Sequence, residues 1–93
     1  METKTPPIRH DPIAQRFELS IEDTTAVAEY RREAGRVIFT HTFVPPALRG
    51  KGLAESLAHT ALQWARAEKL KIVPVCSYIA RFVERHPEYN DRV

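Results

Sequence analysis

Cys76 is the only thiol in the chain, and it stands between a short apolar run, Lys71–Val75, and a segment with helical periodicity. A helix N-terminus lowers the pKa of a thiol because it stabilises the thiolate, which is the nucleophilic form. We therefore predict that Cys76 is a nucleophile in covalent catalysis. The alternative is a small buried side chain that finishes a strand, which is the commoner role of a single cysteine.

His41 lies within the apolar run Val37–Val44, where strand alternation predicts that it shares a face with Val37, Phe39 and Phe43. Histidine is the side chain most often used as a general base, because imidazole exchanges a proton readily near neutral pH. We predict that His41 assists Cys76, and the alternative is a core or edge histidine. No acidic residue can be assigned to orient it, so a Cys/His/Asp triad is not predicted.

The segment Arg49-Gly50-Lys51-Gly52-Leu53-Ala54 joins a predicted strand to a predicted helix. Free N–H groups at a helix N-terminus favour a phosphate, and glycines allow the backbone to approach it. The segment has neither the GxxxxGK[ST] pattern of a Walker A loop nor a GxGxxG pattern. We predict an anion site, and the alternative is a glycine turn with two solvated cations.

Hydrophobic periodicity predicts the elements that position these residues. Period-two alternation indicates strands over 17–21, 25–31, 37–44 and 71–76, with Pro74 suggesting an edge position or a bulge. Apolar residues at three- and four-residue spacing indicate helices over 52–69 and from Tyr78, with Ser77 as N-cap and Pro87 as a stop. The first helix should bury Ala54, Leu57, Ala58, Ala61, Leu62 and Ala65.

The order β-β-β-α-β-α predicts an α+β or α/β fold with a small mixed sheet. Three short-linked strands form an antiparallel meander, and a strand–helix–strand unit adds a parallel neighbour. The loop 45–51 and the residues after Val75 then lie at the same edge of the sheet, where open α/β sheets bind ligands. The anion loop and Cys76 are therefore expected to lie together.

The segment Arg49–Ala54 resembles the Q/R-x-x-G-x-G/A signature of the GNAT superfamily of acyl-CoA-dependent N-acyltransferases. Together with Val44–Gly52, Pro74–Tyr78 and His86–Tyr89 it is similar to a minimal, single-domain branch with a truncated GNAT-like fold. The first helices of larger members are missing here, since only a turn is expected at Glu22–Thr24.

The resemblance implies acetyl-CoA as cosubstrate, with its pyrophosphate on the amides of the loop and its pantetheine along the third strand. It implies transfer of an acetyl group to a primary amine of a protein lysine or a small molecule, through a thioester on Cys76 with help from His41, or by direct attack. Tyr78 is a candidate acid toward CoA, although core packing also explains it. The implied cofactor-binding residues are Phe43, Val44, Arg49, Gly50, Lys51, Gly52, Leu53, Ala54, Ser77 and Tyr78. The alternative function is a CoA-binding module with little catalysis.

The 93 residues are enough for one domain, which we assign to 13–93 after a flexible arm over 1–12. One cysteine excludes an internal disulfide, and the four histidines show no metal-ligand spacing, so no metal is predicted. Basic residues exceed acidic ones by only two and are spread along the chain without interleaved aromatics, which argues against a nucleic-acid partner. No apolar stretch approaches about 18 residues, and no secretory signal is visible, so we expect a cytoplasmic protein without a membrane partner.

Overall fold

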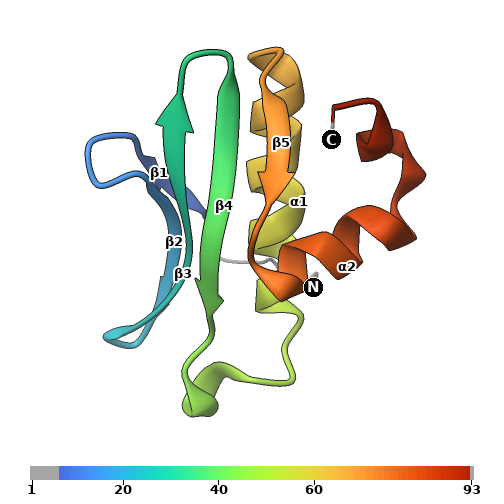
Figure 1. The fold of residues 1–93 in the computed structure, drawn as a ribbon. Coiled ribbons are helices and arrows are strands. Elements are labelled where there is room, and N and C mark those ends of the chain that lie inside the picture. Colours follow the sequence, from blue (N-terminus) through green and yellow to red (C-terminus); the bar gives the residue numbers. More distant parts are fainter. Residues whose placement is uncertain (1–6, 93) are drawn as a thin grey trace.

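Four strands come first in the chain and pair with their neighbours in antiparallel: β1 (Arg9–Asp11), β2 (Arg16–Ile21), β3 (Thr24–Glu33) and β4 (Arg36–Phe43). The computed structural model describes residues 7–92. In it, β5 (Lys71–Pro74) pairs in parallel with β4 and forms one edge of the sheet, whose strand order is β1-β2-β3-β4-β5 (Figure 1). The predicted meander, the parallel unit, the mixed sheet and the edge position of Pro74 are confirmed.

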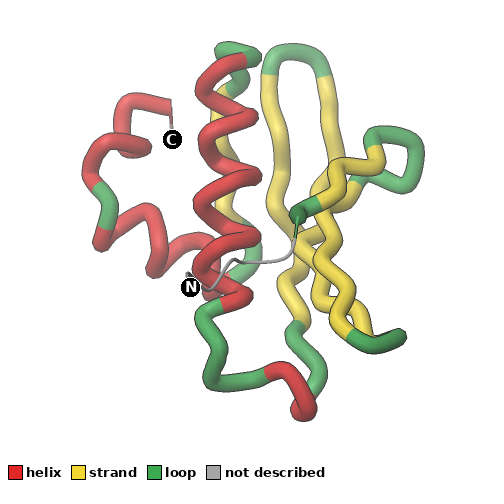
Figure 2. Tube along the Cα trace, turned by 180° about the vertical axis from the view of Figure 1, so that it is seen from behind, coloured by secondary structure: helices red, strands yellow, loops and turns green. Residues whose placement is uncertain are grey.

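Helix α1 (Leu53–Ala67) covers one face of this sheet, and α2 (Ser77–Arg85) lies beyond the β5 edge (Figures 1 and 2). Two short 3-10 helices, η1 (Pro46–Leu48) and η2 (Pro87–Arg92), follow β4 and α2. The side of α1 that faces the sheet buries Leu53, Leu57, Ala58, Ala61, Leu62 and Ala65. Leu53 thus takes the core position that was predicted for Ala54, which is only half-buried.

The short strand β1 is an element that the sequence did not predict. Its His10 ring stacks on Phe17 with 4.1 Å between the ring centroids and lies edge-on to Trp64. His10 Nε2 also shares a hydrogen bond of 2.6 Å with the Tyr30 hydroxyl. The prediction of a flexible arm over 1–12 is therefore wrong for Arg9–Asp11, and residues 1–6 of that arm lie outside the described part.

A β-bulge in β4 changes which side chains face α1. Tyr30 of β3 pairs with Phe39, whereas the preceding residue, Glu29, pairs with His41, so Thr40 is the extra residue in β4. An extra residue reverses the alternation beyond it, because successive side chains of a strand point to opposite faces. Accordingly, Phe39 is fully buried, whereas the exposed His41 belongs to the opposite face.

The link from β5 to α2 also differs from the prediction. β5 ends at Pro74, not at Cys76, and Cys76 is the N-cap residue of α2 in place of Ser77. The Cys76 N–H donates to the Phe39 carbonyl at 2.8 Å, so the chain is still tied to β4 where the two strands part. Among residues 7–92, no helix combines the length and apolar character needed to cross a bilayer.

Candidate functional site

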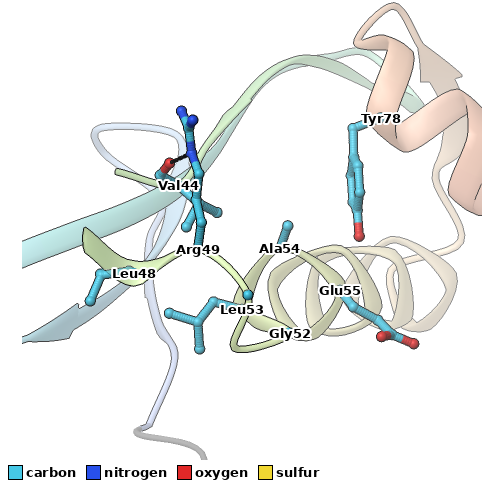
Figure 3. Close-up of a pocket in the computed structure, with 9 residues that line it drawn as sticks. Val44, Leu48, Arg49, Gly52, Leu53, Ala54, Glu55 and Tyr78 are labelled. Atoms are coloured by element: carbon cyan, nitrogen blue, oxygen red, sulfur yellow. Dashed lines mark hydrogen bonds between the residues drawn. The ribbon is translucent and has the colours of Figure 1, made fainter. Parts of the chain in front are cut away.

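The loop from β4 to α1 borders a pocket of about 220 Å³ at the N-terminus of α1. One side of the pocket comes from the end of β4 and from the loop, and the other comes from Tyr78 on α2 (Figure 3). The lining residues are Val44, Leu48, Arg49, Gly50, Gly52, Leu53, Ala54, Glu55 and Tyr78. The apolar walls and the polar helix end give the pocket two chemically different regions.

Glycine is required at two positions of the loop because the backbone is left-handed there. Gly50 has φ 81°, and Gly52, the N-cap residue of α1, has φ 74°. A Cβ atom built on either glycine meets no atom within 4 Å, so both open toward free space. Within the part of the chain that the structure describes, no side chain caps the N-terminus of α1. Its first amides and the positive end of its dipole therefore favour an anion.

The two cations of the loop differ in their positions. The Arg49 Nε donates to the Val44 carbonyl at 2.9 Å, which ties the loop to the end of β4 (Figure 3). Arg49 also lines the pocket, whereas Lys51 is exposed and does not. The positive charge of the site thus comes from Arg49 and the helix end, with Glu55 as an opposing charge in the first turn of α1.

Cys76 is half-buried where β5 gives way to α2. Its Sγ donates a hydrogen bond to Thr42 Oγ1 on β4 at 3.5 Å. Burial by itself raises the pKa of the Cys76 thiol, but contacts with the Thr42 hydroxyl and with the amides of Ile79 and Tyr78 outweigh it, so the pKa is lowered. These amides stabilise the thiolate although the neutral thiol makes no capping hydrogen bond of standard geometry.

His41 does not lie with Cys76 as expected. It is exposed on the face away from α1, where its ring stacks with that of Phe43 at 6.3 Å between centroids. The prediction that His41 shares a face with Val37 and Phe39 is wrong, because the bulge at Thr40 lies between them. The prediction that it shares a face with Phe43 is confirmed.

Tyr78 packs on the core and also borders the pocket. Its ring lies 6.3 Å from that of Phe82, and its hydroxyl points toward the start of α1 (Figure 3). Burial, and then the carboxylate of Glu55, raise the pKa of Tyr78, with Arg85 opposing them. The phenol therefore keeps its proton near neutral pH and is available as a donor.

The structure brings most of the predicted ligand residues to one place. Those that line the pocket are Val44, Arg49, Gly50, Gly52, Leu53, Ala54 and Tyr78, and those that do not are Phe43, Lys51 and Ser77. Sequence reasoning missed Leu48 and Glu55 in the lining, and Thr42 beside the thiol. Leu48 and Glu55 flank the predicted anion loop, so their positions in the sequence could have suggested them. Thr42 reaches the thiol only because of the bulge, which the sequence did not predict.

Comparisons with known proteins agree on a family. A family model described as GCN5-related N-acetyl-transferase matches residues 16–92. The chain is 35% identical to Protein NATD1 of Mus musculus in an alignment 94 residues long, which covers 94% of this chain and 86% of the relative. It is also 35% identical to Protein NATD1 of Homo sapiens over 91 residues, with shares of 92% and 80%.

A solved structure is similar over nearly the whole chain. The NMR solution structure of a GCN5-like protein from Staphylococcus aureus aligns with a TM-score of 0.75 at 25% identity, covering 97% of this chain and 89% of that chain. The family model spans the elements from β2 to η2, including the loop and Cys76. The chain belongs to the GCN5-related N-acetyltransferase family.

Proposed function

We propose that this protein is an acetyl-CoA-dependent N-acetyltransferase that moves an acetyl group to a primary amine of a protein or a small molecule. One observation carries the proposal: an uncapped helix N-terminus with two left-handed glycines borders a pocket whose opposite wall is Tyr78, two residues from a thiol of lowered pKa. Membership of the family supports acetyl-CoA as the donor.

The residues of the pocket fit the parts of acetyl-CoA. Its pyrophosphate suits the free amides of α1 and the Arg49 guanidinium, and the open space above Gly50 and Gly52 leaves room for it. Its pantetheine arm combines two amides with methyl and methylene groups, and these apolar groups suit the wall at Val44 and Leu48. The parting of β4 from β5 beyond Phe39 leaves the end of β4 without a strand partner on that side. We therefore place the pantetheine arm along Val44 and not along Phe43, which is 43% exposed on the face of the sheet away from α1.

Cys76 is the nucleophile of the proposed reaction. Its thiolate attacks the thioester carbonyl carbon, a new C–S bond forms on Sγ, and the bond to the CoA sulfur breaks. Tyr78, whose raised pKa keeps it protonated, donates a proton to the departing CoA thiolate. The amine then attacks the acetyl carbonyl carbon on Cys76, a C–N bond forms, and the C–S bond to Sγ breaks. The proton that the amine loses returns to the Tyr78 phenolate, and Cys76 is left as the thiolate that starts the next cycle.

The position of His41 bears on the alternative function, a CoA-binding module with little catalysis. A base that touched both thiol and amine would make catalysis efficient, but His41 faces away from Cys76 and can serve only an amine that arrives from the exposed face of the sheet. A CoA-binding module with little catalysis is therefore the second candidate. Direct attack by the amine on bound acetyl-CoA, with Cys76 as packing, is the second candidate mechanism.

Mass spectrometry of the intact protein after incubation with acetyl-CoA, with and without a panel of amines, separates these cases. We expect one acetyl group on the parent protein, removed by a productive amine, and none on Cys76→Ala. The variant should keep its CoA affinity within a few-fold and lose turnover by about two orders of magnitude or more. Acetylated amines formed by Cys76→Ala at the parent rate would exclude the covalent route, and bound CoA without any acetylated product would favour the binding module.

A further inference from the structure

We infer that Thr42 is the positioning residue for Cys76, holding the thiol between the end of β4 and the N-terminus of α2 and favouring its reactive form. This inference rests on the proposed function, because it assigns a role toward the nucleophile of that reaction. Among the described residues, Thr42 supplies the one side-chain hydrogen bond to Sγ.

The bulge at Thr40 is what places Thr42 beside the thiol. In a regular strand, Thr42 would share a face with Thr40 and Ile38, and His41 would face α1. Beyond the bulge, Thr42 pairs with the fully buried Ala28 and is itself half-buried on the α1 side. The same local irregularity therefore removes His41 from Cys76 and brings Thr42 to it.

Two contacts on either side of the bulge fix Cys76 to β4. The Cys76 N–H donates to the Phe39 carbonyl at 2.8 Å, and Sγ contacts Thr42 Oγ1 at 3.5 Å. With main chain and side chain both held, Sγ has little freedom to rotate away from the end of β4. This is the geometric requirement for attack on a thioester that lies along the end of β4.

The hydroxyl of Thr42 can serve both forms of the thiol. The neutral thiol donates to Oγ1, and after ionisation the hydroxyl turns to donate to the thiolate. A donor to the charged form favours it. This agrees with the lowered pKa of Cys76, in which Thr42 is the largest factor opposing burial. Tyr78 stays neutral in the relevant pH range, and His41 lies on the other face, so neither should distort the titration of the thiol.

The test is the pH dependence of alkylation of Cys76 by iodoacetamide in the full-length protein. Thr42→Val keeps the branched shape and removes the hydroxyl, and Thr42→Ser keeps the hydroxyl. Thr25→Val is the matched control, because Thr25 is exposed on β3 and loses a comparable bond, to Ser20 at 2.8 Å.

We expect Thr42→Val to raise the midpoint of the profile by about one pH unit, which lowers the rate below the midpoint about tenfold. Its plateau at high pH should equal or exceed that of the parent, because a more basic thiolate is a better nucleophile. Thr42→Ser and Thr25→Val should keep the parent midpoint. A merely structural role for Thr42 would change the melting temperature without moving the midpoint.

An unchanged midpoint in folded Thr42→Val overturns the inference. If that variant does not fold, Thr42→Ala replaces it under the same criterion. Since alkylation needs no acetyl-CoA, the two proposals fail separately. A shifted midpoint without acetyl transfer by the parent would refute the proposed function alone, whereas an active parent with an unchanged midpoint in Thr42→Val would refute the role of Thr42 alone.

Discussion

Replacing Gly52 by alanine tests the anion site with a change of one methyl group. Gly52 has φ 74° and ψ 19° and opens toward free space, so the added Cβ creates strain without a clash. A left-handed backbone costs a residue with a Cβ roughly 1–2 kcal/mol. For a domain of this size, that lowers the melting temperature by about 4–16 °C. The same methyl group would occupy the space that we assign to the CoA pyrophosphate, so CoA binding should suffer beyond the loss of stability.

The chain offers a matched control in Gly35, which has φ 73° and also opens to free space in the turn between β3 and β4. Gly35→Ala should cost the same stability and leave CoA affinity unchanged. Charge-assisted hydrogen bonds contribute about 1.5–3 kcal/mol each, so loss of one from a Gly52 variant should weaken CoA binding by about 10- to 150-fold. Calorimetry at a temperature where both variants are folded measures the difference.

Two results would refute this reasoning. Equal CoA affinity for the parent, Gly52→Ala and Gly35→Ala would show that the loop does not contact the phosphates. Equal weakening in both variants would show that strain, and not the added methyl group, affects binding. Gly52→Asn refines the test, because asparagine tolerates the left-handed region better than alanine and still adds a side chain above the loop.

Two further predictions concern the phenol and the first strand. Tyr78→Phe keeps the packing against Phe82 and removes the proposed acid, so turnover should fall about 100-fold or more with CoA affinity within a few-fold; a full turnover rate would exclude the phenol as the donor. Burial lowers the pKa of His10 against the opposing charges of Asp11 and Glu68. The unfolded chain therefore binds the His10 proton more tightly than the folded protein does. The stability that the neutral ring contributes is complete above the ordinary pKa of 6.5, and it is lost as the pH falls through the lower pKa of the folded protein. Melting temperatures at pH 7.5 and pH 5.5 should thus differ more for the parent than for His10→Gln, and an equal difference in the two proteins would contradict a role for this ring.

Much of the fold was predictable because hydrophobic periodicity reports which face of an element is buried. The alternation at Phe17 and Leu19 and the spacing of Leu57, Ala61 and Leu62 were read correctly, and all five residues are at most 2% exposed. The topology then followed from the length of the connections, since a strand–helix–strand unit makes parallel neighbours. These rules act on whole elements and tolerate errors at single positions.

The strand β1 escaped prediction because three residues carry too short a pattern to recognise. Arg9 and Asp11 are polar, and His10 is half-buried in an aromatic cage that residues 17, 30 and 64 supply from distant parts of the sequence. The strand forms because β2 offers a template edge and the cage receives its central ring. This is a tertiary effect, and no local propensity of Arg9–Asp11 records it.

In the candidate site, too, one part was predictable from the sequence and another part was not. That the glycine loop and Cys76 lie at the same sheet edge follows from topology, and this part of the arrangement was predicted from the sequence. Which β4 side chain faces the thiol depends on one extra residue, Thr40, and nothing in the run from Val37 to Val44 marks a bulge there. This single residue changes the chemistry of the site, because it places the Thr42 hydroxyl beside Sγ where a regular strand would place the His41 imidazole. A hydroxyl orients and stabilises a thiolate but does not take up its proton near neutral pH. In the proposed route, the thiol proton leaves to solvent or to the substrate, and activation of Cys76 depends on the α2 amides and Thr42 in place of a general base.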